Sequence, residues 1–106
     1  MIIGHFLPHD LDPTQARALV EAAFGFYRSR YPRAKISLAW NSDETATVGF
    51  GARGFSFHGT VLLRPGGIEL ELELPFVFRV FHKQALRVVD AEAKKWLERA
   101  RSGSLP

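Results

Sequence analysis

Apolar and polar residues alternate along the stretch from Gly54 to Leu74, on both sides of the turn Pro65-Gly66-Gly67. Alternation with a period of two is typical of a strand with one buried face, and proline and glycine mark the turn between two strands. The stretch therefore predicts an antiparallel hairpin with one apolar side. The apolar positions are Phe55, Phe57, Gly59, Val61, Leu63, Ile68, Leu70, Leu72 and Leu74, and Glu69, Glu71 and Glu73 alternate with the last four.

A second hairpin is predicted immediately before the first. Its turn lies at residues 41–44, and residues 51–54 connect it to the following hairpin, so that residues 36–74 form a four-strand meander. The run from Met1 to Leu7 also reads as a strand, although its position in the sheet stays open. The alternating apolar residues of the second hairpin are Ile36, Leu38, Trp40, Ala46, Val48 and Phe50.

Helical periodicity appears on both sides of the meander. Asp12, Pro13 and Gln15 form a capping-box pattern that starts a helix, and the residue before Pro32 disfavours its continuation, which predicts a helix over residues 13–30. After Pro75 a second helix is predicted over about residues 76–101. The two apolar stripes contain Ala16, Leu19, Val20, Ala23, Phe24 and Tyr27 in the first helix, and Phe78, Phe81, Ala85, Val89, Ala93, Trp96, Leu97 and Ala100 in the second.

The element order predicts an α+β fold. The predicted order is strand, helix, four strands and helix. These elements bury their apolar surfaces together if both helices cover one face of an antiparallel sheet, which gives a two-layer sandwich. The chain of 106 residues has room for one such domain, which we place at residues 1–101, with a flexible C-terminal tail at residues 102–106.

Composition narrows the classes of protein. With 46% hydrophobic and 24% charged residues the chain suits a globular domain, and the absence of cysteine excludes disulfides, thiolate metal sites and a cysteine nucleophile. The N-terminus lacks the basic region of a secretory signal. Charged residues interrupt every apolar run before it reaches the ~20 residues that span a bilayer. We expect a cytoplasmic protein without an integral membrane segment. Its net charge of +3 permits an anionic partner.

No local arrangement of residues predicts catalysis. Counting back from the turn places His58 opposite Glu73 on the polar face, where the two form either an acid–base pair or a solvated cross-strand pair. His5 and His9 flank Pro8 but lack a third ligand at metal spacing, and the glycines form no phosphate-binding motif. We therefore expect a non-enzymatic protein with no metal and no cofactor.

The second predicted helix is the better candidate for a contact surface. Arg79, Lys83 and Arg87 recur at i, i+4 and i+8, and apolar residues crowd its first turns, from Phe76 to Phe81. The cations are either an ordinary solvated face or a site for an anionic partner. The apolar residues are either buried between the sheet and the first helix or exposed for adsorption to an apolar surface. The predicted contact residues are Phe76, Arg79, Val80, Lys83 and Arg87.

Five segments of the chain, taken in order, resemble the polyhydroxyalkanoic acid system protein family. The resemblance spans about residues 3–98 and rests on pattern and length. It implies a cytoplasmic, non-catalytic bacterial protein linked to polyhydroxyalkanoate metabolism or to the organisation of storage-polyester granules, and it carries over no catalytic residue. The segments are His9-Asp10-Leu11, Trp40, Phe57-His58-Gly59, Gly66-Gly67-Ile68 and Leu74-Pro75-Phe76.

We therefore expect a granule-associated or regulatory accessory protein whose partner is a polyester granule surface or a granule protein. A nucleic-acid-binding module that uses the basic C-terminal helix is the first alternative, although neither an RNA-binding signature nor a helix-turn-helix is visible. A small-ligand binder with a pocket between sheet and helices is the second. The oligomeric state stays open, because the first strand and the edges of the meander are both able to pair between chains.

Overall fold

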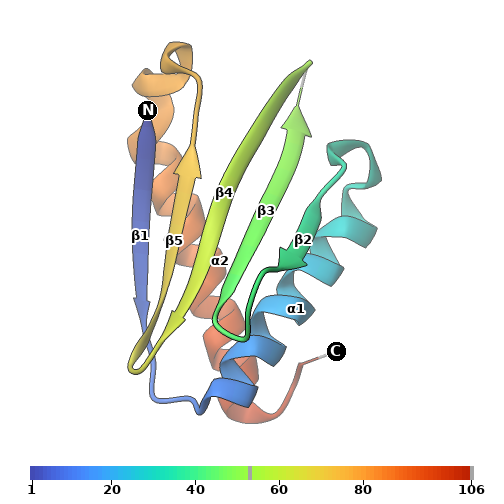
Figure 1. Ribbon diagram of the computed structural model, residues 1–106, viewed down its shortest axis with the longest axis vertical. Helices are drawn as coiled ribbons and strands as arrows, with labels where there is room; N and C mark the ends of the chain where they lie inside the picture. Colours follow the sequence, from blue (N-terminus) through green and yellow to red (C-terminus); the bar gives the residue numbers. More distant parts are fainter. Residues whose placement is uncertain (53, 106) are drawn as a thin grey trace.

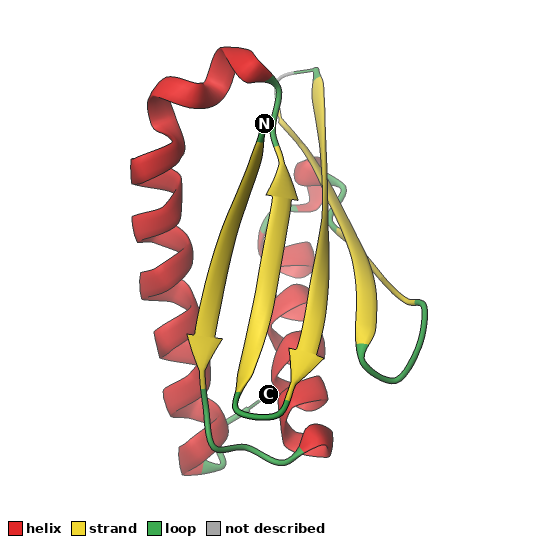
Figure 2. Cartoon of the chain, turned by 60° about the vertical axis from the view of Figure 1, so that its left-hand side comes forward, coloured by secondary structure: helices red, strands yellow, loops and turns green. Residues whose placement is uncertain are grey.

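The computed structural model describes residues 1–52 and 54–105 and shows two layers, an antiparallel sheet and a pair of helices on one of its faces (Figures 1 and 2). The five strands lie in the order β1-β5-β4-β3-β2, so the N-terminal strand sits at one edge beside β5. The predicted α+β fold is confirmed. The elements are β1 (Ile2–Pro8), α1 (Pro13–Arg30), the 3-10 helix η1 (Pro32–Ala34), β2 (Ser37–Trp40), β3 (Thr45–Ala52), β4 (Phe55–Arg64), β5 (Gly67–Glu73), the 3-10 helix η2 (Phe76–Phe81) and α2 (His82–Ser102).

Helix α1 begins and ends where the sequence predicts. The Asp12 carboxylate accepts a hydrogen bond from the backbone N–H of Gln15 at 2.8 Å, and the Gln15 side-chain oxygen accepts one from the backbone N–H of Asp12 at 3.1 Å. This reciprocal cap satisfies two N–H groups that have no partner inside the helix. The helix ends at Arg30, one residue before the residue that precedes Pro32.

The β4–β5 hairpin has the predicted register. Arg64 lies opposite Gly67 and His58 lies opposite Glu73. Gly66 has a φ of +83°, in the left-handed region that glycine adopts without strain. A side chain at Gly67 would collide with the Phe6 ring, which lies across this position from β1. The tight turn thus requires a glycine at position 66, and the neighbouring strand requires one at position 67.

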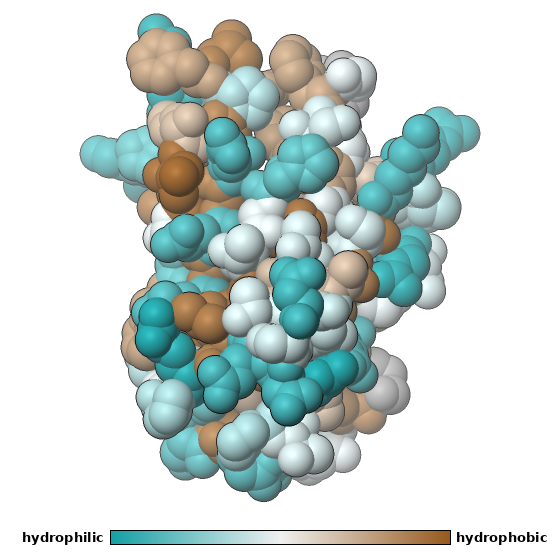
Figure 3. Space-filling view, viewed as in Figure 1, coloured by the Kyte–Doolittle hydropathy of each residue, from teal (hydrophilic) through white to brown (hydrophobic). Residues whose placement is uncertain are grey.

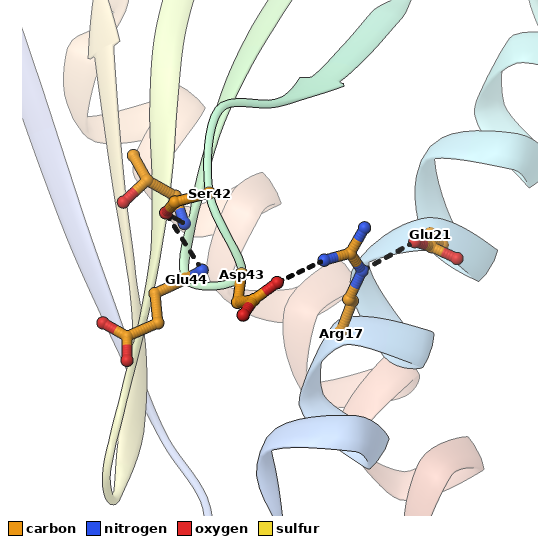
Figure 4. A network of polar contacts seen from close by, with 6 residues as sticks. Arg17, Glu21, Ser42, Asp43 and Glu44 are labelled. Carbon is orange, nitrogen blue, oxygen red and sulfur yellow. Dashed lines mark hydrogen bonds and ion pairs between the residues drawn. The ribbon is translucent and has the colours of Figure 1, made fainter.

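The β2–β3 turn is tied to α1 by charged groups (Figure 4). The Arg17 guanidinium lies 4.3 Å above the ring of Trp40, donates to Glu21 at 3.1 Å and approaches Asp43 at 4.0 Å. Within the turn, the Ser42 hydroxyl accepts a hydrogen bond from the backbone N–H of Glu44 at 3.2 Å. These contacts hold the short outer strand β2 against the helix layer.

Two groups of buried residues stabilise the sandwich. The larger group joins α1, the C-terminal half of α2 and the middle of the sheet, and the smaller group lies at the other end of the sheet. Leu105 also packs against the larger group, beyond the end of α2 at Ser102. The predicted domain limits and flexible tail stay predictions, and Pro106 lies outside the described residues. The smaller group consists of Ile3, Phe57 and Leu74, with Phe78, Ala85 and Leu86 packed against it.

The start of the last helix differs from the prediction. Instead of one helix from about residue 76, the chain forms the 3-10 helix η2 over Phe76–Phe81 and begins the α-helix at His82. Pro75 and Phe81, which precede the two segments, have no side-chain oxygen that could cap a helix, and valine and phenylalanine are modest helix formers. The predicted α-helix is therefore confirmed from His82 onward, and the segment before it is a 3-10 helix.

Candidate contact surface

The η2 segment exposes most of its large apolar side chains to solvent. The exposed fractions are 67% for Phe76, 60% for Val77, 71% for Val80 and 55% for Phe81. These four residues are called the η2 cluster below. Figure 3 shows apolar residues gathered at the top of the molecule, where Figure 1 places η2 and the start of β1. The alternative that this segment is buried between the sheet and α1 is therefore wrong.

Phe78 is the η2 residue that turns inward and anchors the segment. Its ring meets Phe55 edge to face with centroids 5.0 Å apart and Phe57 with centroids 5.4 Å apart. Phe57 in turn stacks on Phe50 at 4.8 Å. Because Phe78 is held by this aromatic group, the η2 cluster is presented on a fixed backbone instead of on a free loop.

The cations of the predicted site lie beside the η2 cluster. The Arg79 guanidinium stacks 4.3 Å above the Phe76 ring and donates to the Phe76 carbonyl oxygen at 3.3 Å. Lys83 and Arg87 are exposed on the first turns of α2. Arg79 belongs to η2, so the expected i, i+4, i+8 stripe on one continuous α-helix is wrong, and only Lys83 and Arg87 keep α-helical spacing.

Two lysines farther along α2 are engaged by carboxylates. Lys94 contacts Asp90 at 2.8 Å and Lys95 contacts Glu92 at 2.9 Å. The ammonium group of Lys94 is the largest cause that lowers the pKa of Asp90. The basic character of α2 is thus partly neutralised toward its C-terminus, and the cations next to η2 are the ones that lie among exposed apolar residues.

Two exposed apolar residues near η2 were not among the predicted contacts. Phe55, at the start of β4, is 44% exposed and touches Phe78, and Ile2, at the start of β1, is 67% exposed. Alternation assigns Phe55 to the apolar face of its strand, and Ile2 lies in the short apolar run that predicts the N-terminal strand. Their distance from Phe76 in the sequence hides the fact that the starts of β1 and β4 and the end of β5 lie at the same end of the sheet (Figure 1).

His58 and Glu73 lie opposite each other on the outer face of the sheet, as predicted, and both are exposed. With Ser56 and Phe76 they line an open depression of about 420 Å³ beside η2. Among the described residues, no group of three or more histidine or acidic side chains is placed to hold a metal ion.

A separate cavity of about 170 Å³ lies between α1, α2 and the sheet and is lined almost entirely by apolar side chains. At its rim, the Trp96 Nε1–H donates to the Tyr27 hydroxyl at 2.9 Å, and that hydroxyl donates to Glu92 Oε1 at 2.7 Å. Burial, followed by the hydrogen bond to Glu92, raises the pKa of Tyr27 to about 12. Hydrogen bonds from Lys95 and Tyr27 lower the pKa of Glu92. This network joins the two helices.

His9 is the one polar residue among the buried side chains of the described chain. Its Nδ1 accepts a hydrogen bond from the backbone N–H of Leu11 at 3.1 Å, just before α1 begins. Desolvation lowers the pKa of His9, and the nearby Asp10 carboxylate opposes this shift. The neutral His9 ring therefore stabilises the β1–α1 connection through its hydrogen bond with Leu11.

Comparison with known proteins gives one family. A family model described as putative polyhydroxyalkanoic acid system protein matches residues 6–97. No curated protein and no solved structure gives a significant match. Among the described residues, no helix is long and apolar enough to cross a membrane.

Proposed function

The chain belongs to the putative polyhydroxyalkanoic acid system protein family, and from this membership we propose that it is a non-catalytic accessory protein that contacts polyhydroxyalkanoate granules in the cytoplasm through the η2 cluster. One observation carries the proposal: four large apolar side chains, each more than half exposed, lie within six residues and adjoin exposed cations. Large contiguous apolar patches are rare on the surface of monomeric proteins and commonly mark a site of interaction.

The chemistry of the η2 cluster suits a polyester surface. Polyester chains offer aliphatic and ester groups, so apolar side chains gain by leaving water there, at about 1–2 kcal/mol for each of the four residues after allowing for the area already covered. Arg79, Lys83 and Arg87 are suited to carboxylate chain ends or to anionic head groups at the granule boundary. Because Phe78 already fixes η2, little conformational entropy is lost on binding.

The direct test is cosedimentation with purified polyester granules. We expect the wild type to pellet with the granules and a Phe76→Ser/Val80→Ser variant to remain mostly in the supernatant. Tyr31→Ser is a matched control, because Tyr31 is a 53% exposed aromatic residue outside the η2 cluster. Equal recovery of the wild type in the supernatant with and without granules would overturn the proposal.

The role of the cations is separable from that of the apolar residues. Lys83→Gln/Arg87→Gln should weaken granule binding at low salt and flatten its salt dependence, since exposed charges are screened within about 10 Å at 0.1 M salt. Arg33→Gln/Lys35→Gln, which removes two exposed cations in η1 and just after it, should leave both the binding and its salt dependence unchanged. If the two double variants behave alike, net charge and not the η2 site governs the attraction.

A further inference from the structure

The two edges of the sheet differ in how well they are protected. β2 has four residues and is tied to α1 through Arg17 and Trp40, whereas β1 has seven residues. Figure 2, which brings the β1 side forward, shows β1 with no described segment in front of it. Natural sheets usually guard a long edge with charges, bulges or a covering segment. The sequence of β1, IIGHFLP, has no lysine, arginine or acid and has a proline only at its end.

The free edge of β1 carries unused backbone hydrogen-bonding groups. Met1 and Leu74 exchange backbone hydrogen bonds at 3.0 and 2.7 Å, and the N–H of His9 donates to Gly66 at 2.9 Å. In an antiparallel pair these bonds recur at every second residue, so the odd-numbered residues of β1 face β5. The N–H and C=O groups of Ile2, Gly4 and Phe6 therefore point to the open side.

The side chains of those same residues lie on the outer face of the sheet. Ile2 is 67% exposed and Phe6 is 48% exposed, and Gly4 lies midway between them. The edge thus presents an apolar residue, a glycine and an apolar residue at every second position. Two copies of a strand with this pattern therefore match each other when they run antiparallel.

We propose that β1 pairs antiparallel with β1 of a second copy of this chain, which joins two five-stranded sheets into one. With Gly4 opposite Gly4 of the second copy, Ile2 lies opposite Phe6 in both directions, and every free N–H of the edge finds a carbonyl acceptor. Aromatic and β-branched residues form favourable cross-strand pairs. A two-residue shift would place Phe6 opposite Gly4 and Ile2 opposite Pro8 and would lose both apolar pairs.

The rest of the molecule leaves room for this pairing. The row Glu69, Glu71 and Glu73 lies on β5, so two β1 strands would separate the two acidic rows by about 14 Å, at roughly 4.8 Å for each strand spacing. In Figure 1, α2 crosses behind the sheet at an angle, from behind β1 at the top toward α1 at the bottom. In the two-fold pair, the start of α2 in one copy lies beside the end of β1 in the other copy. At that end of the sheet, α2 of the other copy has already moved away from β1 toward α1.

Sedimentation velocity over a range of protein concentration tests the proposal, with a pair of variants that depends on the register. Ile2→Lys/Phe6→Lys places like charges opposite each other and should weaken the dimer by at least about tenfold. Ile2→Lys/Phe6→Glu places opposite charges in the same positions and should dimerise more tightly than the first variant. Ala39→Lys puts the same charge on the exposed face of β2 and should have no effect.

Two further results decide the outcome. Gly4→Pro removes an N–H that is unused in the monomer, so the monomer should stay folded by circular dichroism while dimerisation is lost. Amide exchange at Gly4 and Phe6 should slow as protein concentration rises. A wild type that is monomeric up to about 1 mM, or two double variants with equal dimer affinity, would show that β1 does not pair in this way. Granule binding by the η2 cluster is a separate property, and neither result depends on it.

Discussion

The C-terminal helical segment contains apolar residues at both of its ends, but the two ends have opposite environments. In the second half of α2, Trp96 is 4% exposed and Leu97 is 7% exposed, whereas in η2 Phe76 and Val80 are about two-thirds exposed. Trp96 packs against Phe26 and Tyr27 of α1, while η2 extends past the end of α1 and meets the strand ends instead. Helical apolar spacing therefore marks a core only where a second layer covers it.

The largest effect is expected for Trp96→Ala. This change removes a buried ring, its hydrogen bond to Tyr27 and its stacking with Arg99 at 4.8 Å, so the free energy of unfolding should fall by about 3–5 kcal/mol. Urea denaturation followed by circular dichroism measures the loss. If the variant does not fold, Trp96→Phe keeps most of the volume and should cost less. A loss below about 1 kcal/mol for Trp96→Ala would contradict the assignment of α2 to the core.

A smaller loss is expected for Phe78→Ala, which truncates the inward-facing residue of η2. The free energy of unfolding should fall by about 1–3 kcal/mol, because the ring is only half-buried but contacts Phe55 and Phe57. The same variant should bind granules more weakly, since η2 would lose its anchor. Unchanged stability would show that η2 is not held by the sheet.

The Tyr27 network makes stability depend on alkaline pH. The pKa of Tyr27 is raised to about 12 from an ordinary value of 10.0, so the folded protein holds the phenol proton more tightly than the unfolded chain does. Its contribution to stability is therefore complete below pH 10 and is lost as the pH rises through the interval from 10 to about 12. Denaturation of the wild type and Tyr27→Phe across this interval should show a steeper decline for the wild type.

The Tyr27 titration also has a direct readout. In a Tyr31→Phe variant the single remaining phenol should titrate near pH 12 when its ultraviolet absorbance is followed. Tyr27→Phe should itself reduce stability by about 0.5–1.5 kcal/mol at neutral pH, because Trp96 and Glu92 lose their shared partner. An ordinary tyrosine titration in Tyr31→Phe would contradict the network.

The smallest effect on stability is expected in the η2 cluster itself. Val77→Ser and Val80→Ser should each change the free energy of unfolding by less than about 0.5 kcal/mol, since both residues are at least 60% exposed. The proposed function requires the same variants to reduce granule binding. Unchanged stability together with weaker binding would give the two ends of the segment different roles. A large stability loss would contradict the exposure of the η2 cluster.

Much of the fold was readable from local patterns. The capping box at Asp12 defined the start of α1, and the turn at Pro65-Gly66-Gly67 defined the register that sets His58 opposite Glu73. Of the candidate site, the predicted contact residues Phe76 and Val80 are exposed, whereas the contribution of Phe55 was missed. Phe55 and Phe78 are separated by more than twenty residues in the sequence and meet only because β4 and β5 pair side by side.

The amino-acid sequence is sufficient to predict the elements and their apolar faces, because a period of two, helical spacing, caps and turns are properties of neighbouring residues. The sequence does not predict which apolar residues stay in water, because burial depends on which surfaces of different elements meet. The open-edge position of β1 beside β5 and the extension of η2 beyond α1 are both properties of the tertiary structure. Both surfaces on which this protein is proposed to act arise from that arrangement.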